Sequence, residues 1–371
     1  MSRDGTGGPA PGEPRREVAL RPGYHSPQVE VDVRLNTNES PEPPPQAFVE
    51  ALADELRSIP LHRYPDREAV ALRTALATHH GVSAEQVFCA NGSNEAIQCL
   101  LLAYGGSNRP AMLFEPTYAL HSHIARLTGT PVVAGGRDDA FKVELAEVAR
   151  TVTASVELYG PAAPAVTFLC SPNNPTGGVE AIETIRAVLA LVPGILVVDE
   201  AYGQFAPSSA LELLDFDPRL VVLRTFSKTW ALAGLRLGYA IADPGVVASL
   251  SNVALPYHLD ALKQAAGCLA LGFESEMRAR VAATVEERGR VATALGDLPV
   301  DVWPSDANFI LFRAGSQDGS AVWKGLLDHS VLVRDVSDWP GLEGCLRVTI
   351  GTASENDRFL SALADVLSAR S

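Results

Sequence analysis

LVVLRTFSKTWALAGLRLG, residues 220 to 238, contains the lysine on which the interpretation of the whole chain depends. The apolar run from Leu220 to Leu223 predicts a buried strand, and Lys228 follows in the turn after it. The chain has four lysines against twenty-six arginines. A lysine here suggests amine chemistry, because only an ammonium can lose its proton and attack a carbonyl. Taken alone, however, Lys228 fits a solvated surface lysine better.

The composition is that of an ordinary globular protein. With 371 residues, of which 47% are hydrophobic, the chain is long enough for one large and one smaller domain. Its net charge of −14 argues against nucleic-acid and anionic-membrane partners, which attract basic surfaces. Five separated cysteines without a CxxC pair indicate buried thiols in a reducing cytosol. The sequence has no signal-peptide core and no run of about eighteen apolar residues, so it predicts a cytoplasmic protein.

Strands and helices alternate along the middle of the chain. Apolar spacing predicts amphipathic helices at residues 46–57 and 68–80. Apolar runs that end in polar turns follow, at residues 87–90, 112–114, 166–170, 195–198 and 221–223, with one more strand at 238–242. This alternation predicts an α/β fold with a mainly parallel sheet covered by helices. Ligands of such sheets bind beyond the carboxyl ends of the strands, where the polar turns should lie.

The pattern changes after residue 257. Residues 258 to about 296 are helical by pattern and suggest a spine between domains. Strands at 308–312, 331–333 and 346–350 and a helix at 321–329 follow, and Thr352 to Glu355 is a capping box that opens a last helix. We expect a flexible tail at 1–28, an arm at 29–45 that packs with the small domain, a large domain at 46–257 and a smaller α+β domain at 258–371.

Gly92-Ser93-Asn94 opens a helix directly after a strand. Backbone N–H groups, the helix dipole and a serine hydroxyl can bind a phosphate there. An equally good interpretation is that Ser93 only caps the helix. A nucleotide P-loop is excluded, because none of the lysines follows a glycine.

Other polar residues also have two interpretations each. Asp199 ends an apolar strand, where a carboxylate is costly unless it meets a cation, but it could also cap a helix. Asn174 lies in a proline-rich turn that could be structural, and Tyr202 follows Asp199 by three residues. Arg236 and Arg347 flank apolar residues and could pair with structural carboxylates.

Two other functional motifs, a histidine metal site and a hydrolase serine, are not supported by the sequence. His121-x-His123 and the pair His79-His80 have no acidic residue at metal-ligand spacing, so we expect no metal. No GxSxG occurs, which argues against an α/β-hydrolase serine.

One cofactor accounts for all these groups together. The aldehyde of pyridoxal phosphate needs a lysine amine, its phosphate needs a helix end, and its pyridinium nitrogen needs a carboxylate. The conjunction favours the functional interpretation of each residue over the structural one.

The motifs resemble those of the fold-type-I aminotransferases that use pyridoxal phosphate, and among them the histidinol-phosphate aminotransferases of actinobacteria. The resemblance spans nearly the whole chain, from LNTNE at 35–39 to RVTIGT at 347–352. Its specific motifs are RYPD at 63–66, NGSNEAI at 91–97, EPTY at 115–118, SPNNPTG at 171–177, VVDEAY at 197–202, RTFSKTWALAGLRLGY at 224–239, PYHL at 256–259 and VLVRD at 331–335.

The resemblance implies a role for each matching residue. Lys228 would bond to the cofactor's aldehyde and later move the proton between Cα and C4′. Asp199 would keep the pyridine nitrogen protonated, Asn174 and Tyr202 would contact the phenolic oxygen, and Tyr118 would stack on the ring. The residues expected at the phosphate are Gly92, Ser93, Asn94, Ser227 and Arg236, with Tyr64 from the partner subunit of a homodimer that shares its active sites.

The resemblance also implies a substrate site. Arg347 would bind the carboxylate of glutamate or the phosphate of histidinol phosphate, and Arg334, Tyr24 and Asn38 would assist it, because a guanidinium suits both anions. The reaction would convert glutamate and imidazole acetol phosphate into 2-oxoglutarate and histidinol phosphate.

Three alternative functions stay open for the same fold and cofactor. They are an aromatic or specialised-pathway aminotransferase, a lyase like the threonine-phosphate decarboxylases, and a non-enzymatic sensor that binds pyridoxal phosphate. The chain departs from many relatives at Ser40, at Asn94 and at Thr229-Trp230. These residues flank the cofactor or the entrance and leave every catalytic group in place.

Overall fold

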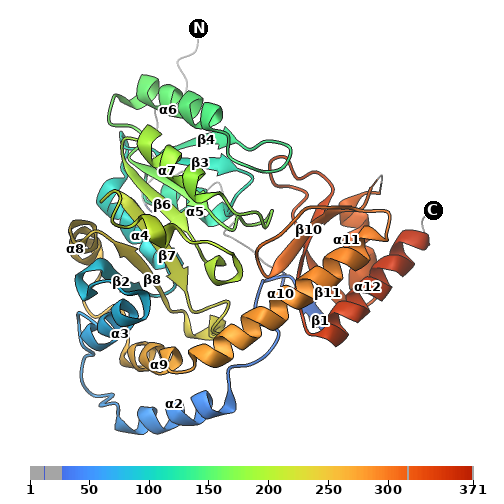
Figure 1. Cartoon of the computed structure of the whole chain (residues 1–371), viewed down its shortest axis with the longest axis horizontal. Helices are drawn as coiled ribbons and strands as arrows, with labels where there is room; N and C mark the ends of the chain where they lie inside the picture. The colour runs from blue at the N-terminus through green and yellow to red at the C-terminus, as the bar shows by residue number, and fades with distance from the viewer. Residues whose placement is uncertain (1–11, 13–26, 316, 370–371) are drawn as a thin grey trace.

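The computed structural model describes residue 12 and residues 27–315 and 317–369. Its larger sheet has seven strands in the order β2-β8-β7-β6-β5-β3-β4 (Figure 1). The strands are β2 (Val87–Ala90), β3 (Ala111–Glu115), β4 (Val132–Gly136), β5 (Val166–Cys170), β6 (Ile195–Asp199), β7 (Leu220–Thr225) and β8 (Gly238–Ala242). The strand β8 is antiparallel to both of its neighbours, β2 and β7, and the other pairings in this sheet are parallel. The predicted α/β class with a mainly parallel sheet is confirmed, although β4, with two glycines in VVAGG, was not predicted.

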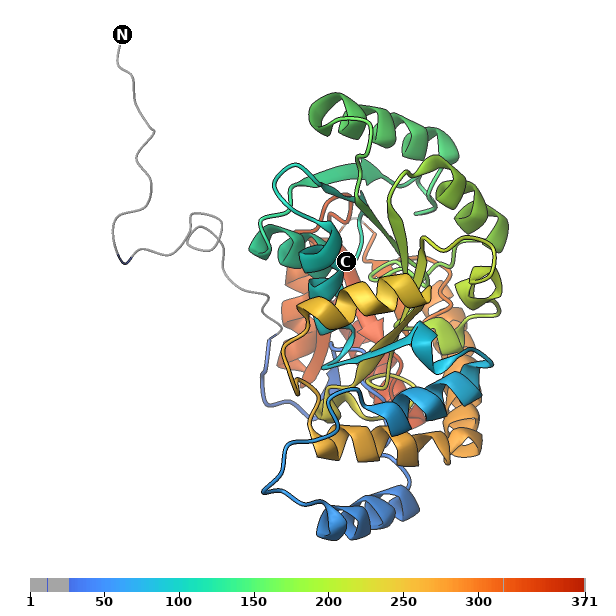
Figure 2. The same ribbon diagram turned by 90° about the vertical axis from the view of Figure 1, so that its left-hand side faces the viewer.

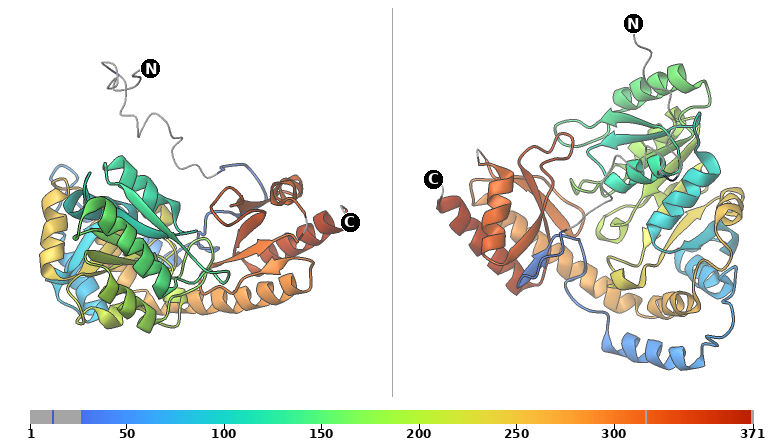
Figure 3. Two further views of the ribbon diagram at one scale, coloured as in Figure 1. Left: turned by 90° about the horizontal axis from the view of Figure 1, so that it is seen from above. Right: turned by 180° about the vertical axis from the view of Figure 1, so that it is seen from behind.

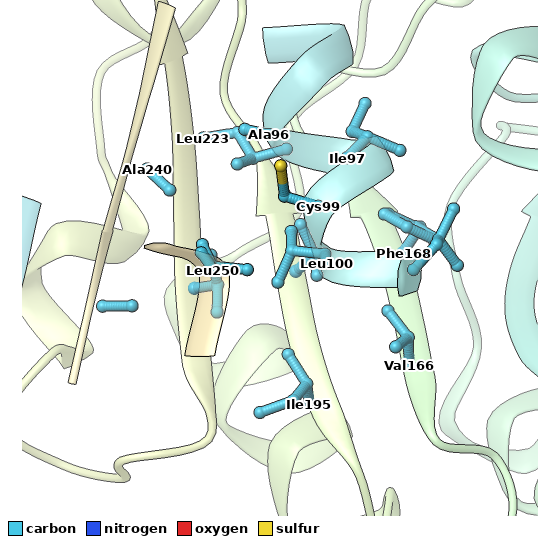
Figure 4. Close-up of a cluster of buried hydrophobic side chains, with 14 of the residues drawn as sticks. Ala96, Ile97, Cys99, Leu100, Val166, Phe168, Ile195, Leu223, Ala240 and Leu250 are labelled. Carbon is cyan, nitrogen blue, oxygen red and sulfur yellow. The ribbon is translucent and has the colours of Figure 1, made fainter. Parts of the chain in front are cut away.

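Both faces of this sheet are buried, which explains why its strands are apolar at consecutive positions. In β7, Val221 and Leu223 face one core and Leu220 and Val222 face the other. Figure 4 shows the first core, where the helix that follows β2 lies against side chains of the central strands. The helices of the large domain are α2 (Gln46–Ser58), α3 (Val70–His80), α4 (Ser93–Tyr104), α5 (Ala119–Leu127), α6 (Leu145–Tyr159), α7 (Ile182–Leu191), α8 (Pro244–Val253) and α9 (Ala261–Leu271), with short 3-10 turns at Ala84–Gln86, Gly203–Phe205, Ala210–Leu213 and Ala233–Leu235.

A second sheet of five strands carries the rest of the chain, in the order β1-β11-β12-β10-β9. Its elements are β1 (Val33–Leu35), β9 (Asp301–Val302), β10 (Phe309–Arg313), β11 (Val331–Asp335), β12 (Cys345–Thr349), α11 (Gly319–Asp328) and α12 (Ala353–Ser368). The predicted capping box of the last helix is present, with Thr352 and Glu355 bonded reciprocally. The parallel pairing of β1 with β11 ties the residues of the expected arm to this sheet.

The segment predicted to be one helical spine contains two helices. The first, α9, ends at Leu271, and α10 (Glu274–Gly296) runs from the large sheet to the small one (Figures 1 and 3). Side chains of α9 share a core with Leu72 and Leu76 of α3. The predicted domain boundaries after residues 28, 45 and 257 remain predictions. Within the described part of the chain, no helix combines the length and the apolarity that a membrane span requires.

Candidate active site

The carboxyl ends of the parallel strands meet the small sheet around a cavity of about 330 Å³. Eleven of the fifteen predicted site residues line this cavity: Asn38, Ser93, Asn94, Tyr118, Asn174, Asp199, Tyr202, Ser227, Lys228, Arg236 and Arg347. They come from the arm, from the ends of β2, β3, β5, β6 and β7, and from β12. The cavity therefore depends on both sheets and on the arm.

Lys228 points into this cavity and is not a solvated surface lysine. Its Nζ donates to the backbone oxygen of Thr37 at 3.1 Å and lies 5.7 Å from the centre of the Tyr202 ring. Burial, followed by the positive charge of Arg347, lowers the pKa of Lys228 to about 7, while Glu39 acts in the opposite direction. Near neutral pH roughly half of the molecules thus carry an amine that can accept a proton or attack a carbonyl.

This pKa gives a first prediction for the protein without cofactor. The acetylation rate of Lys228 by acetic anhydride, followed by peptide mass spectrometry, should reach half its maximum near pH 7. The exposed Lys324 of α11 provides the internal control for reagent decay. A midpoint for Lys228 near the ordinary value of 10.5 would show that its ammonium is well solvated.

The start of α4 and the turn after β7 together form a cationic pocket. Gly92 caps α4 with φ of +77°, so the alternative that Ser93 is the cap is wrong. A Cβ at Gly92 would lie 2.8 Å from Nη2 of Arg236, and a Cβ at Gly238 would lie 2.4 Å from the backbone nitrogen of Ser93. Nη1 of Arg236 donates to Oγ of Ser227 at 3.2 Å. The two glycines let a guanidinium, hydroxyl groups and the positive end of a helix converge, which is the donor set of a phosphate site.

Asp199 has a partner that sequence reasoning missed. Its Oδ2 lies 2.9 Å from Nε2 of His121, and its Oδ1 accepts from the backbone nitrogen of Ala201 at 3.1 Å. His121 is fully buried and stacks on Phe168, with ring centroids 4.6 Å apart. In the sequence, His121 stands out only as a poor metal-ligand pair with His123, although its position three residues after Tyr118 places it near the same strand end. The imidazole of His121 therefore fixes the orientation of the Asp199 carboxylate.

Asn174, Tyr202 and Arg347 meet on the other side of the cavity. Nη1 of Arg347 donates to Oδ1 of Asn174 at 2.6 Å, and its Nη2 donates to the backbone oxygen of Asn36 at 2.8 Å. Nδ2 of Asn174 lies 3.5 Å from the hydroxyl of Tyr202. Burial raises the pKa of Tyr202 above its ordinary value, so its hydroxyl keeps its proton at neutral pH.

Because these side chains converge on one cavity, a functional interpretation of them is favoured over a structural one. Comparison with known proteins agrees with the functional interpretation. A family model described as aminotransferase class I and II matches residues 30–363. The chain belongs to this family. It is 43% identical over 362 residues to the histidinol-phosphate aminotransferase of Mycobacterium marinum, covering 95% of this chain and 92% of that one.

Solved structures share the fold of this aminotransferase. The histidinol-phosphate aminotransferase of Sinorhizobium meliloti, solved in complex with pyridoxal-5′-phosphate, superposes with a TM-score of 0.82 at 24% identity, over 92% of each chain. The L-threonine-O-3-phosphate decarboxylase of Porphyromonas gingivalis superposes with a TM-score of 0.78 at 23% identity, over 91% of this chain and 99% of that one. At these identities the two structures establish the fold.

The aminotransferase cavity fits pyridoxal phosphate, and this predicted cofactor is confirmed. A Cβ at Gly92 would occupy the space beside Arg236 that a phosphate needs, and Asp199 offers an anion to a ring N–H. Lys228 supplies the amine that an aldehyde requires. Among the residues that the structure describes, no group of three His, Cys, Asp or Glu side chains is placed to hold a metal ion.

Four predicted site residues do not line the cavity. Gly92 precedes Ser93, which does line it, and Arg334 lies opposite Arg347 in the ladder of β11 and β12. Tyr64 is 81% exposed and stacks on Tyr257, with ring centroids 4.6 Å apart. Tyr24 lies outside the described residues.

Proposed function

We propose that this aminotransferase transfers an amino group from glutamate to imidazole acetol phosphate, giving 2-oxoglutarate and histidinol phosphate. The observation that carries the proposal is the single cavity that joins an amine of lowered pKa, a phosphate site and the buried guanidinium of Arg347. The similarity to the Mycobacterium marinum enzyme selects this substrate among phosphorylated and aromatic amines.

The residues that line the cavity have different roles in this proposed reaction. When bound, pyridoxal phosphate supplies an aldehyde that accepts the amine and a ring that withdraws electrons. Lys228 removes and returns the proton at the substrate Cα, because its Nζ lies in the cavity and its burial favours the neutral amine. Asp199, oriented by His121, holds a positive charge at the far end of the cavity. Arg347 holds the substrate anion by a bidentate contact that suits carboxylate and phosphate alike.

A half-reaction panel tests this assignment. The cofactor-loaded enzyme is mixed separately with histidinol phosphate, glutamate, phenylalanine and threonine phosphate, and the loss of the visible absorbance is followed in each case. We expect fast loss with histidinol phosphate and glutamate. Fast loss with phenylalanine but not with histidinol phosphate would establish an aromatic aminotransferase, and release of carbon dioxide from threonine phosphate would establish a lyase.

Arg334 is proposed to strengthen the anion site from behind Arg347, because the two residues are partners across β11 and β12. Removing a second positive charge weakens binding of a phosphate more than binding of a carboxylate, since the phosphate carries more charge. Arg334→Ala should therefore raise KM by a larger factor for histidinol phosphate than for glutamate. Equal factors for the two substrates would remove Arg334 from the anion site.

We further propose that two copies of the chain form a homodimer. Leu61 and Tyr64 lie between α2 and α3, and Leu255 and Tyr257 lie after α8. Leu61 is 79% and Leu255 is 77% exposed, an unusual exposure for apolar side chains beside a stacked tyrosine pair. The helix α2, whose only buried residue is Phe48, stands at the margin of the molecule (Figure 2). In a dimer, Tyr64 would reach the phosphate site of the partner subunit.

Leu255→Asp tests the dimer, because a buried carboxylate at a subunit interface lacks a cation to offset its desolvation. Light scattering at micromolar concentration should change from twice the chain mass to the chain mass, and the affinity for pyridoxal phosphate should fall. Leu158→Asp is the matched control, since Leu158 is 71% exposed on α6 at the opposite end of the molecule (Figure 1). A wild-type protein of single chain mass would refute the dimer.

A cytoplasmic location remains a prediction from the sequence.

A further inference from the structure

The hydroxyl of Tyr202 is surrounded by amide donors. Nδ2 of Asn38 donates to this hydroxyl at 2.9 Å, and Nδ2 of Asn174 lies 3.5 Å from it. An amide N–H cannot accept a proton, so both contacts use lone pairs of the phenolic oxygen. The proton of Tyr202 is therefore left for an acceptor on the cavity side.

This arrangement holds only if both amides have the correct orientation, since an asparagine turned by 180° would present its oxygen and accept the tyrosine proton. For Asn174 the orientation is determined by Arg347, which donates to Oδ1 at 2.6 Å. For Asn38 it is determined by Thr349, whose Oγ1 donates to Oδ1 at 3.0 Å. The same Oγ1 accepts the backbone N–H of Asn38 at 3.0 Å, so its own proton remains for Oδ1.

The position of Asn38 is itself fixed by its surroundings. Its φ is +54°, a left-handed conformation that asparagine adopts more easily than most residues. Nδ2 of Asn308 donates to its backbone oxygen at 3.2 Å. Asn38, Asn308, Thr349 and Tyr202 are all at most 4% exposed. Water therefore cannot replace these hydrogen bonds at low cost.

We propose that Thr349 and Asn38 are positioning residues that direct the phenolic proton of Tyr202 into the cavity. Thr349 and Arg347 lie two residues apart on β12, hence on the same side of the strand, and each orients one of the two amides. This inference rests on the proposed function, in which an electron-rich oxygen of the bound cofactor accepts the Tyr202 proton. A donor to that oxygen stabilises its anionic form.

The charged and titratable groups around Tyr202 are the same in every variant below. Lys228 lies over the Tyr202 ring, Arg347 faces it from β12, and Asp199 and Cys170 face it from β6 and β5. The first two are cationic or partly so, and Asp199 is the nearby anion. A change at Thr349 removes a neutral hydroxyl and leaves all four in place.

The test compares Thr349→Ser with Thr349→Ala, because both lose the methyl group and only the first retains the hydroxyl. The visible absorbance of the cofactor-loaded, substrate-free enzyme is titrated with pH. In Thr349→Ala the midpoint should rise by about half a unit to one unit, the effect expected for one lost hydrogen bond. In Thr349→Ser it should stay within about 0.2 units of the wild type, by the same relation.

Thr284→Val is the matched control for loss of a buried threonine hydroxyl. Thr284 is 6% exposed on α10, and its Oγ1 donates to the backbone oxygen of Arg280. We expect its thermal unfolding midpoint to fall without a change in the absorbance titration. If Thr349→Ala does not fold, Thr349→Val replaces it, since valine retains the shape of threonine and suits a strand.

The outcomes separate this inference from the proposed function. A wild-type protein that gains no visible band with pyridoxal phosphate would refute the proposed function. A wild-type band that titrates, with equal midpoints in Thr349→Ser and Thr349→Ala, would refute the role of Thr349 alone. A rise confined to the alanine variant supports the inference.

Discussion

Lys228→Ala should lower kcat by about 10⁴-fold or more, since general acid–base catalysis alone contributes up to that factor. By the proposed mechanism, the variant also loses the amine that bonds to the aldehyde of the cofactor. The substitution removes few structural contacts, because within the described part of the chain the Lys228 ammonium donates one hydrogen bond, to the backbone oxygen of Thr37, and forms no salt bridge. Single-turnover absorbance with glutamate provides the measurement.

Lys324→Ala is the matched control for Lys228→Ala, because Lys324 is exposed on α11 and does not line the cavity. It should turn over at the wild-type rate. Borohydride treatment followed by peptide mapping gives a second readout, with the cofactor retained on residue 228 in the wild type and in Lys324→Ala but not in Lys228→Ala. Retained borohydride-stable cofactor in Lys228→Ala would assign the attachment to another residue.

Arg347→Ala should lower kcat/KM for histidinol phosphate by about 10²–10³-fold. Truncating one partner of a buried charged hydrogen-bond pair costs about 3–4 kcal/mol, and each 1.4 kcal/mol is about tenfold. The loss has two physical parts. By the proposed mechanism the substrate anion loses its guanidinium, and Asn174 loses the donor that holds its Oδ1 at 2.6 Å.

The same variant should alter the protonation of Lys228. The positive charge of Arg347 lowers the pKa of Lys228, so its removal should raise the acetylation midpoint of Lys228 above 7 in the cofactor-free protein. Arg313→Ala is the matched control, because Arg313 lies on the adjacent strand β10 in an exposed ion pair with Asp301. An exposed pair of this kind contributes about 1 kcal/mol or less. Equal kinetic losses in the two variants would exclude a specific role for Arg347.

The sheet and its functional edge were predictable from the sequence because both depend on local patterns. Runs such as VVL at 221–223 are apolar at every position only when both sheet faces are covered. The polar residues expected at the site follow such runs directly in the sequence. The residue types Lys228, Asp199 and Arg236 then limited the chemistry to one cofactor. The missed strand β4 and the break between α9 and α10 have weak local patterns, since glycines or a short turn interrupt them.

Only the tertiary structure could determine the contacts between distant residues. Thr349 meets Asn38 across 311 positions of sequence, and His121 meets Asp199 across 78. The hydrophobic periodicity of the sequence does not indicate such pairs, because each depends on how two sheets and an arm pack together. The sequence by itself therefore determined the fold class, the cofactor and most of the residues that line the cavity. The tertiary structure decided which side chains orient those residues, since hydrogen-bond direction in a buried site is set by the neighbours that packing brings within about 3 Å.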